Sequence, residues 1–401
     1  MDAPVEVARK PPGRPAVGLV LTGGGARSAY QVGVLLALAE LMPRARNPFP
    51  VIVGTSAGAV AACVLAAEAH HWRRAVTGLE RVWANFRTGQ VFHVDPLHML
   101  RAGMHWLLAL VSGGLVLSPP KALLDNSPLR QLLATEVDYK NIHRSITRGH
   151  LQGFALCATS FATGQSVAFF DGRESIPEWT RVQRIGRRTE LTLDHLMASA
   201  AIPLLFPPIC IGREYFGDGA MRQLNPLSPA IHLGADRLLI IGVRARQAAG
   251  VGAGSGTSRT MPTPGEVLGY MIDTLFTDQV YGDLEQVERI NQLVQQAPFA
   301  ARGLRHVETL MLAPSIDPRE IAARYTDDMP RSLRALLRVI GGRDVSGYQL
   351  ASYLMFEAGY TRALIELGYR DAMEARAALV AFMSGERLPP LMTAAGVAQA
   401  T

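Results

Sequence analysis

The sequence predicts an α/β protein in which a mostly parallel sheet is flanked by helices, with additional helices toward the C-terminus. Two early apolar runs each lead through a glycine-rich turn into a helix-forming stretch. Short apolar runs then alternate with helical patterns to about residue 243, and helical spacing dominates beyond residue 264. Strands that alternate with helices are typical of a parallel sheet, because each crossover helix packs against the sheet before the next strand begins.

The first strand-to-helix unit contains a glycine-rich turn. An apolar run at residues 16–21 precedes the turn at 23–27, and residues 28–41 have helical spacing. Such turns lie at the carboxyl edge of a parallel sheet, where these folds bind their ligands. The free N–H groups of the turn, aided by the helix dipole, are therefore expected to form an oxyanion hole. These amides belong to Gly24, Gly25 and Ala26.

The same turn has a rival interpretation as a dinucleotide-binding fingerprint. Gly23 and Gly25 give the GxG pattern after a strand. The third glycine is missing, because position 28 is Ser, and no acidic residue closes the next strand near Val53. Since the fingerprint requires both features, the sequence argues against nucleotide binding, and it contains no Walker loop.

The second unit is typical of a nucleophile elbow. An apolar run at residues 51–53 enters a Gly-Thr-Ser-Ala-Gly motif that extends from Gly54 to Gly58, and residues 59–69 have helical spacing. A sharp strand-to-helix turn needs small neighbours and exposes its central side chain, which makes Ser56 the candidate nucleophile. The motif also occurs by chance in ordinary turns, but the adjacent glycine-rich turn favours the catalytic interpretation.

A nucleophilic serine needs a base, and two kinds of partner are available. Asp218 lies in a Phe-Gly-Asp-Gly-Ala loop at residues 216–220, where Gly219 allows another backbone to approach. A structural Asx turn is the alternative role for this aspartate. In a Ser-His-Asp arrangement the base would be His232 or His306, but both are expected to be polar residues at the edges of elements.

The remaining elements follow from the apolar patterns. Further strands are expected at residues 154–158, 167–170, 238–243 and 307–312. Beyond them, three-to-four spacing of apolar residues predicts helices. These helices are expected at residues 265–294, 332–340, 348–367 and 372–383.

Four segments carry a resemblance to a known family. In order and spacing, over roughly residues 16 to 243, the chain resembles the patatin-like phospholipases, in the bacterial branch of that family. The matching segments are residues 23–35, 54–58, 198–203 and 218–220. The third segment is expected to serve mainly as scaffold, ending a helix and turning the chain toward Asp218.

The resemblance implies roles for individual residues. Family members use a Ser–Asp catalytic pair without histidine, which implies Ser56 and Asp218 here, and their glycine-rich turn is the oxyanion hole. Two positions depart from the family pattern, Ser28 in place of the usual Gly and Ala220 where DGG is common, and both leave the pair intact. The expected supporting residues are Gly23, Arg27, Gly54, Gly58 and Gly219.

These features predict a domain organisation. A patatin-like catalytic domain is followed by a loop rich in Gly, Ser, Thr and Pro and by a helical region packed on the catalytic domain. Both ends of the chain are expected to be flexible. The expected boundaries are a lead-in at 1–15, the catalytic domain at 16–249, the loop at 250–264, the helical region at 265–390 and a tail at 391–401.

The predicted activity is that of a serine acyl hydrolase that cleaves lipid esters, of phospholipase A or lysophospholipase type. Asp218 would accept the Ser56 proton, and an acyl-enzyme would form and then be hydrolysed. No cofactor or metal ion is expected, because no metal-ligand spacing occurs. Two alternatives stay open: a lipid-binding or regulatory protein with little turnover, and a Ser-His-Asp esterase.

Three features bear on contact with a lipid surface. Arg27 either attracts an anionic head group or braces the turn by pairing with a carboxylate. The apolar segment at 104–117 is too short to span a bilayer; we expect a buried core segment, with a lid or interfacial patch anchored by Trp106 as the alternative. Net charge is +6. Four arginines within residues 181–188 would lie in a solvated loop or touch phosphates. They are Arg181, Arg184, Arg187 and Arg188.

Location and partners are predicted from composition. The three cysteines, Cys63, Cys157 and Cys210, lie in apolar settings and are expected to be buried, reduced thiols of a cytoplasmic protein. The N-terminal residues resemble neither a secretion signal nor an anchor. We therefore expect a cytoplasmic enzyme, with a peripheral contact at the inner membrane as an option. Its partner is a phospholipid or other lipid ester and not a nucleic acid, and the oligomeric state stays open.

Overall fold

The computed structural model describes most of the chain. The described residues are 15–43, 46–112, 122–245, 261, 263–274, 279–296, 304–339 and 348–386. Most of the expected lead-in and loop, and the whole of the expected tail, lie outside these ranges.

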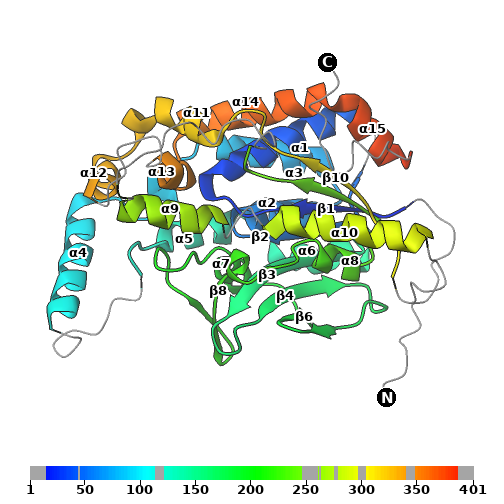
Figure 1. Cartoon of the computed structure of the whole chain (residues 1–401), viewed down its shortest axis with the longest axis horizontal. Helices are drawn as coiled ribbons and strands as arrows, with labels where there is room; N and C mark the ends of the chain where they lie inside the picture. Colours follow the sequence, from blue (N-terminus) through cyan, green and yellow to red (C-terminus); the bar gives the residue numbers. More distant parts are fainter. Residues whose placement is uncertain are drawn as a thin grey trace.

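Five parallel strands form the centre of the sheet (Figure 1). In spatial order they are β10 (Glu308–Leu312), β9 (Arg237–Ile241), β1 (Val17–Leu21), β2 (Val51–Thr55) and β3 (Gly153–Ser160). Both faces of the central strands are covered, so their sequences are continuous apolar runs rather than alternating ones. All five coincide with predicted strands, with ends that differ by a few residues, and they confirm the predicted fold class.

Beyond β3 the sheet continues with mixed pairing, which is antiparallel except between β4 (Ser166–Gly172) and β6 (Arg184–Arg188). β4 pairs antiparallel with β3 over its whole length. β6 and β5 (Trp179–Arg181) continue from β4, while β8 (Glu214–Asp218) pairs with the end of β3 and with β7 (Ile209–Ile211). Only β4 was expected from the sequence. The other four strands beyond β3, which are β5 to β8, are short and partly exposed, so they lack the apolar runs that mark a buried strand.

Helices cover both faces of the sheet (Figure 1). α1 (Ala29–Leu41), which follows the glycine-rich turn, packs along α14 (Ala358–Glu374) from the C-terminal region. The approach is close: a Cβ on Gly33 would lie 1.9 Å from the carbonyl oxygen of Ile365. α2 (Ala57–Ala67) lies on the same side of the sheet, so the C-terminal region shares the main hydrophobic core with the first half of the chain.

The other helices complete the layers. On the opposite face, apolar side chains of α8 (Ser228–His232) and α10 (Gln279–Gln296) pack on the sheet. The C-terminal region also supplies β10, so it contributes a strand as well as helices. The remaining helices are α3 (Trp72–Trp83), α4 (Pro96–Val111), α5 (Ser127–Glu136), α6 (Tyr139–Thr147), α7 (Leu193–Ser199), α9 (Pro264–Asp273), α11 (Pro318–Arg324), α12 (Arg331–Val339), α13 (Tyr348–Leu354) and α15 (Arg376–Ser384).

The segment expected to be a buried core element is an exposed helix. α4 stands away from the sheet in Figure 1, and Met104, Leu108 and Val111 are 50%, 49% and 78% exposed. The expectation of burial is wrong for these three side chains, because apolar content alone does not show which helix the sheet covers. The side chain of Trp106 and residues 113–117 lie outside the described part. Among the residues that the structure describes, no helix is long and apolar enough to cross a bilayer.

Two further expectations need correction. Cys63 and Cys157 are buried as expected, but Cys210 is exposed, because it lies in β7, a short strand whose one pairing among the described strands is with β8. The arginine-rich stretch at 181–188 is not a loop but most of the β5–β6 hairpin. Within it, Arg188 Nη1 donates to the carbonyl oxygen of Gly172 at 2.7 Å, so this guanidinium braces the sheet.

Candidate active site

Ser56 occupies a strained turn between β2 and α2. Its φ and ψ are 54° and −129°, a conformation that costs a non-glycine residue roughly 1–3 kcal/mol. The neighbours must be small: a Cβ on Gly54 would lie 2.6 Å from Ala59 Cα, and one on Gly58 would lie 2.5 Å from the Leu21 carbonyl oxygen. The backbone therefore has the sharp strand-to-helix turn that the motif predicted.

The glycine-rich turn lies beside this elbow. It enters the short 3₁₀ helix η1 (Gly25–Ser28), which packs against α2. Gly25 has a φ of 53°, and a Cβ on Gly24 would lie 2.5 Å from Val243 Cγ2, so both positions require glycine. Within the described ranges, the turn's first amides donate to no backbone acceptor. They are those of Gly24, Gly25 and Ala26.

Asp218 reaches the same region from β8. In the pairing of β8 with β3, Asp218 lies opposite Ala158. The carboxylate Oδ1 of Asp218 accepts a hydrogen bond from the Ala220 amide at 2.9 Å. Oδ2 is buried without a hydrogen-bond partner among the residues described. At the next position the loop packs directly against the backbone of β3, since a Cβ on Gly219 would lie 2.2 Å from the Cys157 carbonyl oxygen. The Asx turn that was considered as a structural role is thus present, but it uses only one carboxylate oxygen.

Burial controls the acidity of this carboxyl group. Asp218 is 1% exposed, and its burial raises its pKa to about 7, while a side-chain interaction with Ser56 and the Ala220 amide lower it. Ser56 therefore lies near enough to Asp218 for its side chain to affect the pKa of the carboxyl group. The sequence suggested Ser56 and Asp218 as partners, but it does not show how far the pKa of Asp218 moves.

The turn after α7 connects the two residues. Ser199 Oγ accepts a hydrogen bond from the Ser56 amide at 3.1 Å, and the carbonyl oxygen of Ala201 accepts one from the Asp218 amide at 2.8 Å. This segment was expected to serve mainly as scaffold. Ser199 is fully buried. Its position inside the matched segment at residues 198–203 was the signal that could have marked it.

The two candidate histidines lie elsewhere. His232 is followed by Leu233, which packs on Gly153 where β3 begins, and His306 precedes the start of β10. Ser56 follows the end of β2, which is parallel to β3. Both histidines are therefore at the opposite edge of the sheet from Ser56, and neither is placed to act as its base. His232 instead stacks on Trp179, with ring centroids 4.5 Å apart.

Arg27 faces inward from the turn. Its side chain is 1% exposed and forms an ion pair with Asp273 of α9, with 2.9 Å between Nη1 and Oδ1. Of its two predicted roles, the structure supports bracing, because a side chain so deeply buried does not meet a lipid head group.

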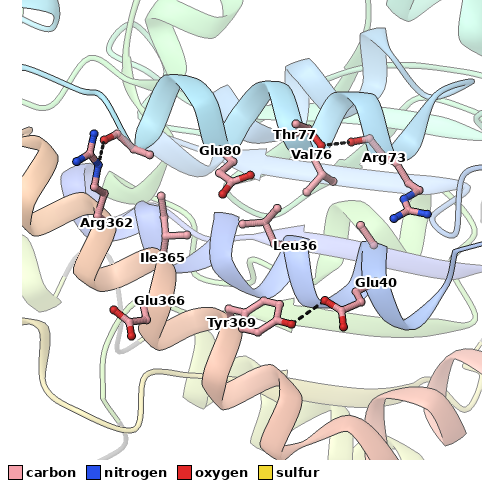
Figure 2. Close-up of a pocket in the computed structure, with 12 residues that line it drawn as sticks. Leu36, Glu40, Arg73, Val76, Thr77, Glu80, Arg362, Ile365, Glu366 and Tyr369 are labelled. Atoms are coloured by element: carbon pink, nitrogen blue, oxygen red, sulfur yellow. Dashed lines mark hydrogen bonds between the residues drawn. The ribbon is translucent and has the colours of Figure 1, made fainter.

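A separate groove lies among the outer helices (Figure 2). Its volume is about 610 Å³, and it lies between α1, α3 and α14. Leu36, Val76 and Ile365 give it apolar walls, and Tyr369 donates a hydrogen bond to Glu40 Oε2 at 2.6 Å. Its lining includes neither member of the proposed pair, so this groove is distinct from the candidate active site. Within the described part, no three His, Cys, Asp or Glu side chains cluster as metal ligands would.

Comparison with known proteins identifies the family of the chain. The family model described as patatin-like phospholipase matches residues 19–231, more than half of the chain, and the chain therefore belongs to this family. Membership supports a lipid ester hydrolase in general. No curated protein sequence matches the chain.

One solved structure that matches the chain is human GIVD cytosolic phospholipase A2 in complex with methyl gamma-linolenyl fluorophosphonate. The identity is 14% and the TM-score is 0.42, over 92% of this chain and 59% of that one. The chain thus spans less than two thirds of the length of that relative.

Proposed function

We propose that the protein is a serine acyl hydrolase that cleaves lipid esters, of phospholipase A or lysophospholipase type, with Ser56 as nucleophile and Asp218 as base. The observation that supports this most is the buried Asp218 carboxyl, whose Oδ2 has no hydrogen-bond partner among the described residues and whose pKa responds to the Ser56 side chain. A buried polar atom without a partner destabilises the fold, so its presence calls for a role such as catalysis.

The proposed reaction gives Ser56, Asp218 and the turn amides one role each. Asp218 Oδ2 accepts the Ser56 proton as Oγ attacks the ester carbonyl, and the free turn amides hold the developing oxyanion. The protonated carboxyl then gives the proton to the departing alcohol, leaving an acyl-enzyme that water hydrolyses with Asp218 again as the base. A carboxyl with a pKa of about 7 suits both steps, because it accepts and returns a proton near neutral pH.

Labelling with a fluorophosphonate tests this proposal. We expect wild-type protein to be labelled at Ser56 and to hydrolyse lipid esters, and Ser56→Ala to lose both. Asp218→Asn should be labelled far more slowly, whereas His232→Ala and His306→Ala should keep their activity. A folded wild-type protein that hydrolyses no lipid ester and is not labelled would instead indicate a lipid-binding or regulatory protein.

Substrate class is the next question for the same site. Hydrolysis should be profiled across diacyl phospholipids, lysophospholipids and short acyl esters under one set of conditions. A preference for either phospholipid class over the short esters supports the lipid assignment. A clear preference for short esters contradicts it while leaving the Ser56–Asp218 pair intact.

We further propose that the enzyme is cytoplasmic and meets its substrate at a lipid surface through α4 and α9. Both helices lie at the same end of the molecule in Figure 1, and α9 ends beside the glycine-rich turn at Asp273. Their exposed apolar side chains are suited to the interfacial region of a bilayer. They are Leu97, Met104, Leu108, Val111, Val267, Tyr270 and Met271.

Vesicle binding tests the surface contact. Leu108→Glu combined with Val111→Glu should weaken cosedimentation with anionic phospholipid vesicles and leave hydrolysis of a soluble ester unchanged. Val182→Glu is the control, because that side chain is 91% exposed on the β5–β6 turn and lies outside both helices. Equal vesicle binding by wild type and the α4 double variant contradicts a role for α4.

A further inference from the structure

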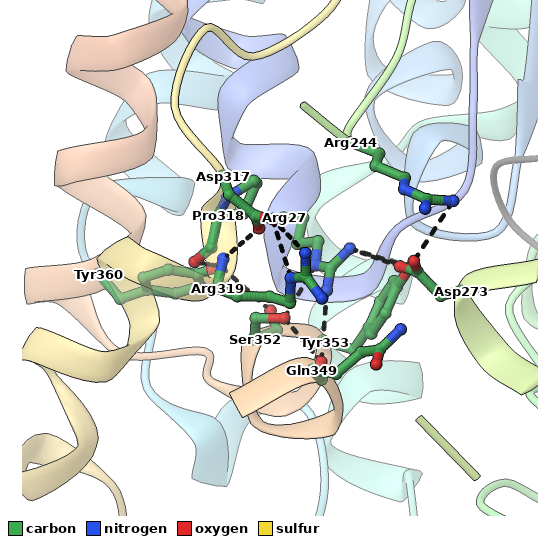
Figure 3. A network of polar contacts seen from close by, with 10 residues as sticks. All are labelled: Arg27, Arg244, Asp273, Asp317, Pro318, Arg319, Gln349, Ser352, Tyr353 and Tyr360. Carbon is green, nitrogen blue, oxygen red and sulfur yellow. Dashed lines mark hydrogen bonds and ion pairs between the residues drawn. The ribbon is translucent and has the colours of Figure 1, made fainter. Parts of the chain in front are cut away.

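The glycine-rich turn is held by helices that lie outside the matched family region. The ion pair of Arg27 and Asp273 joins the turn to the end of α9. α13 lies beside them in Figure 3. Both helices come well after residue 231, where the family match ends.

α13 engages the guanidinium group on several sides (Figure 3). Arg27 Nε donates to Ser352 Oγ at 2.8 Å, and Nη2 donates to the Gln349 carbonyl oxygen at 3.4 Å. The guanidinium carbon lies 3.9 Å from the centroid of the Tyr353 ring. The Tyr353 hydroxyl in turn donates to Asp273 Oδ1 at 2.7 Å, so α9 and α13 are also joined to each other.

α13 also touches the backbone of the turn. A Cβ on Gly25 would lie 2.4 Å from the Tyr353 carbonyl oxygen. The same short helix therefore packs against the backbone of Gly25 and binds the side chain of Arg27. Ala26, whose amide is one of the three proposed oxyanion donors, lies between these two points of contact.

The charges around Arg27 keep it ionised. Burial lowers the pKa of its guanidinium, but Tyr353 and Asp273 raise it, and the net result is a pKa above the ordinary value. Asp273 also lies 3.5 Å from Arg244 through its other oxygen. A buried charge that loses its partner is strongly destabilised, so Arg27 is confined to this arrangement.

We propose that Arg27 is a positioning residue and that Asp273 and Tyr353 hold it so that the turn amides keep the geometry needed to bind the oxyanion. α9 and α13 thereby act on the active site without touching the substrate. This inference rests on the proposed function, since it assigns a role to the same turn.

Three variants separate positioning from folding. Tyr353→Phe removes one hydroxyl and keeps the ring, and Asp273→Asn removes the charge. The double variant Arg27→Met with Asp273→Leu replaces the buried pair with apolar side chains, an exchange that often preserves stability. For each variant we would measure kcat and KM on a soluble activated ester, the rate of fluorophosphonate labelling at Ser56, and Tm.

The double variant should fold, with kcat and labelling rate reduced about 10- to 100-fold and KM changed less than about threefold, because oxyanion donors act in the transition state. Tyr353→Phe should show the same pattern with a smaller reduction in kcat. Asp273→Asn should have a lower kcat and also a lower Tm than the wild type.

Glu308→Gln is the matched control. It removes one partner of another buried ion pair, in which Arg237 Nη2 lies 2.6 Å from Glu308 Oε2. This pair joins the starts of β9 and β10, at the opposite edge of the sheet from Ser56. Its loss should lower Tm and leave kcat unchanged.

The outcomes distinguish the two proposals. Wild-type kcat and labelling in a folded double variant overturn the positioning role while the Ser56–Asp218 proposal stands. If the double variant fails to fold, Tyr353→Phe decides, and an unchanged kcat in that variant overturns the role. Wild-type protein that is neither labelled nor active contradicts the proposed function itself, whatever the variants do.

Discussion

The backbone amide of Ser56 donates a hydrogen bond to the side chain of Ser199, 143 residues further along the chain, at 3.1 Å. Two residues later, the carbonyl oxygen of Ala201 accepts a hydrogen bond from the amide of Asp218. A single turn at the end of α7 therefore fixes the backbone of both members of the proposed pair. The relative position of nucleophile and base depends on this turn as much as on the sheet.

Ser199→Ala should weaken the elbow. It leaves the buried Ser56 amide without its acceptor, which costs about 1–3 kcal/mol, and it releases a strained turn. We expect a lower Tm and a kcat reduced by about tenfold or more. Ser332→Ala is the control, because its hydroxyl donates to the Val94 carbonyl oxygen away from the site and its loss should not change kcat. Equal kcat in the two variants would show that Ser199 does not position Ser56.

Activity should depend on pH through Asp218. The carboxyl must be ionised to act as a base, and burial raises its pKa to about 7. The value of kcat/KM should therefore rise about tenfold per pH unit below this pKa and level off above it. A profile measured on a soluble ester checks this. A plateau that already begins near pH 4 would show that the carboxyl has an ordinary pKa and is not desolvated.

Asp218→Asn should increase stability at neutral and alkaline pH. The folded-state pKa is above the unfolded-state value, so between about pH 4 and pH 7 the unfolded chain releases a proton that the folded chain retains. Wild-type stability therefore falls as pH rises through this window, by up to about 4 kcal/mol at roughly 1.36 kcal/mol per pKa unit. Asn carries no such penalty.

Urea unfolding at two pH values checks the stability prediction. The advantage of Asp218→Asn over wild type should be small near pH 4 and large near pH 8. An advantage that is independent of pH would point to packing rather than to the ionisation of the carboxyl group.

Glycine substitutions should separate close contacts from helix propensity. A Cβ on Gly58 would lie 2.5 Å from two backbone oxygens, those of Leu21 and Thr22, so Gly58→Ala should destabilise the fold and reduce activity. Gly78, within α3, has nothing within 4 Å of the same position. Gly78→Ala should therefore stabilise the protein by up to about 1 kcal/mol with activity unchanged. Similar Tm changes in both variants would contradict the tight packing at Gly58.

The sequence predicted the elements that have strong local signals. β1 and β2 are continuous apolar runs followed by glycine-rich turns, and both were placed to within a residue or two. β5 to β8 were missed because short, half-exposed strands form through pairing with neighbouring strands rather than through the preferences of their own residues. The exposed face of α4 was missed for a related reason, since an apolar helix looks the same whether or not the sheet covers it.

The sequence indicated which residues to consider as the candidate site, but not the hydrogen bonds and ion pairs that hold those residues in place. The motifs around Ser56 and Asp218 are local, and each needs a specific backbone shape. The partners of Arg27 on α9 and α13 are far along the chain, and no pattern near Arg27 indicates them. Ser199 is similar: its segment at residues 198–203 was matched, but nothing in that segment indicates that the hydroxyl accepts from the distant Ser56 amide.

The position of β10 also has a practical consequence for recombinant expression. β10 covers the outer side of β9 by parallel pairing from Glu308 to Leu312. A chain shortened to residue 245 would leave the amides and carbonyls of a largely apolar strand open to other molecules, which is a template for aggregation. Shortening the protein to residue 245 should therefore give insoluble material rather than a minimal enzyme.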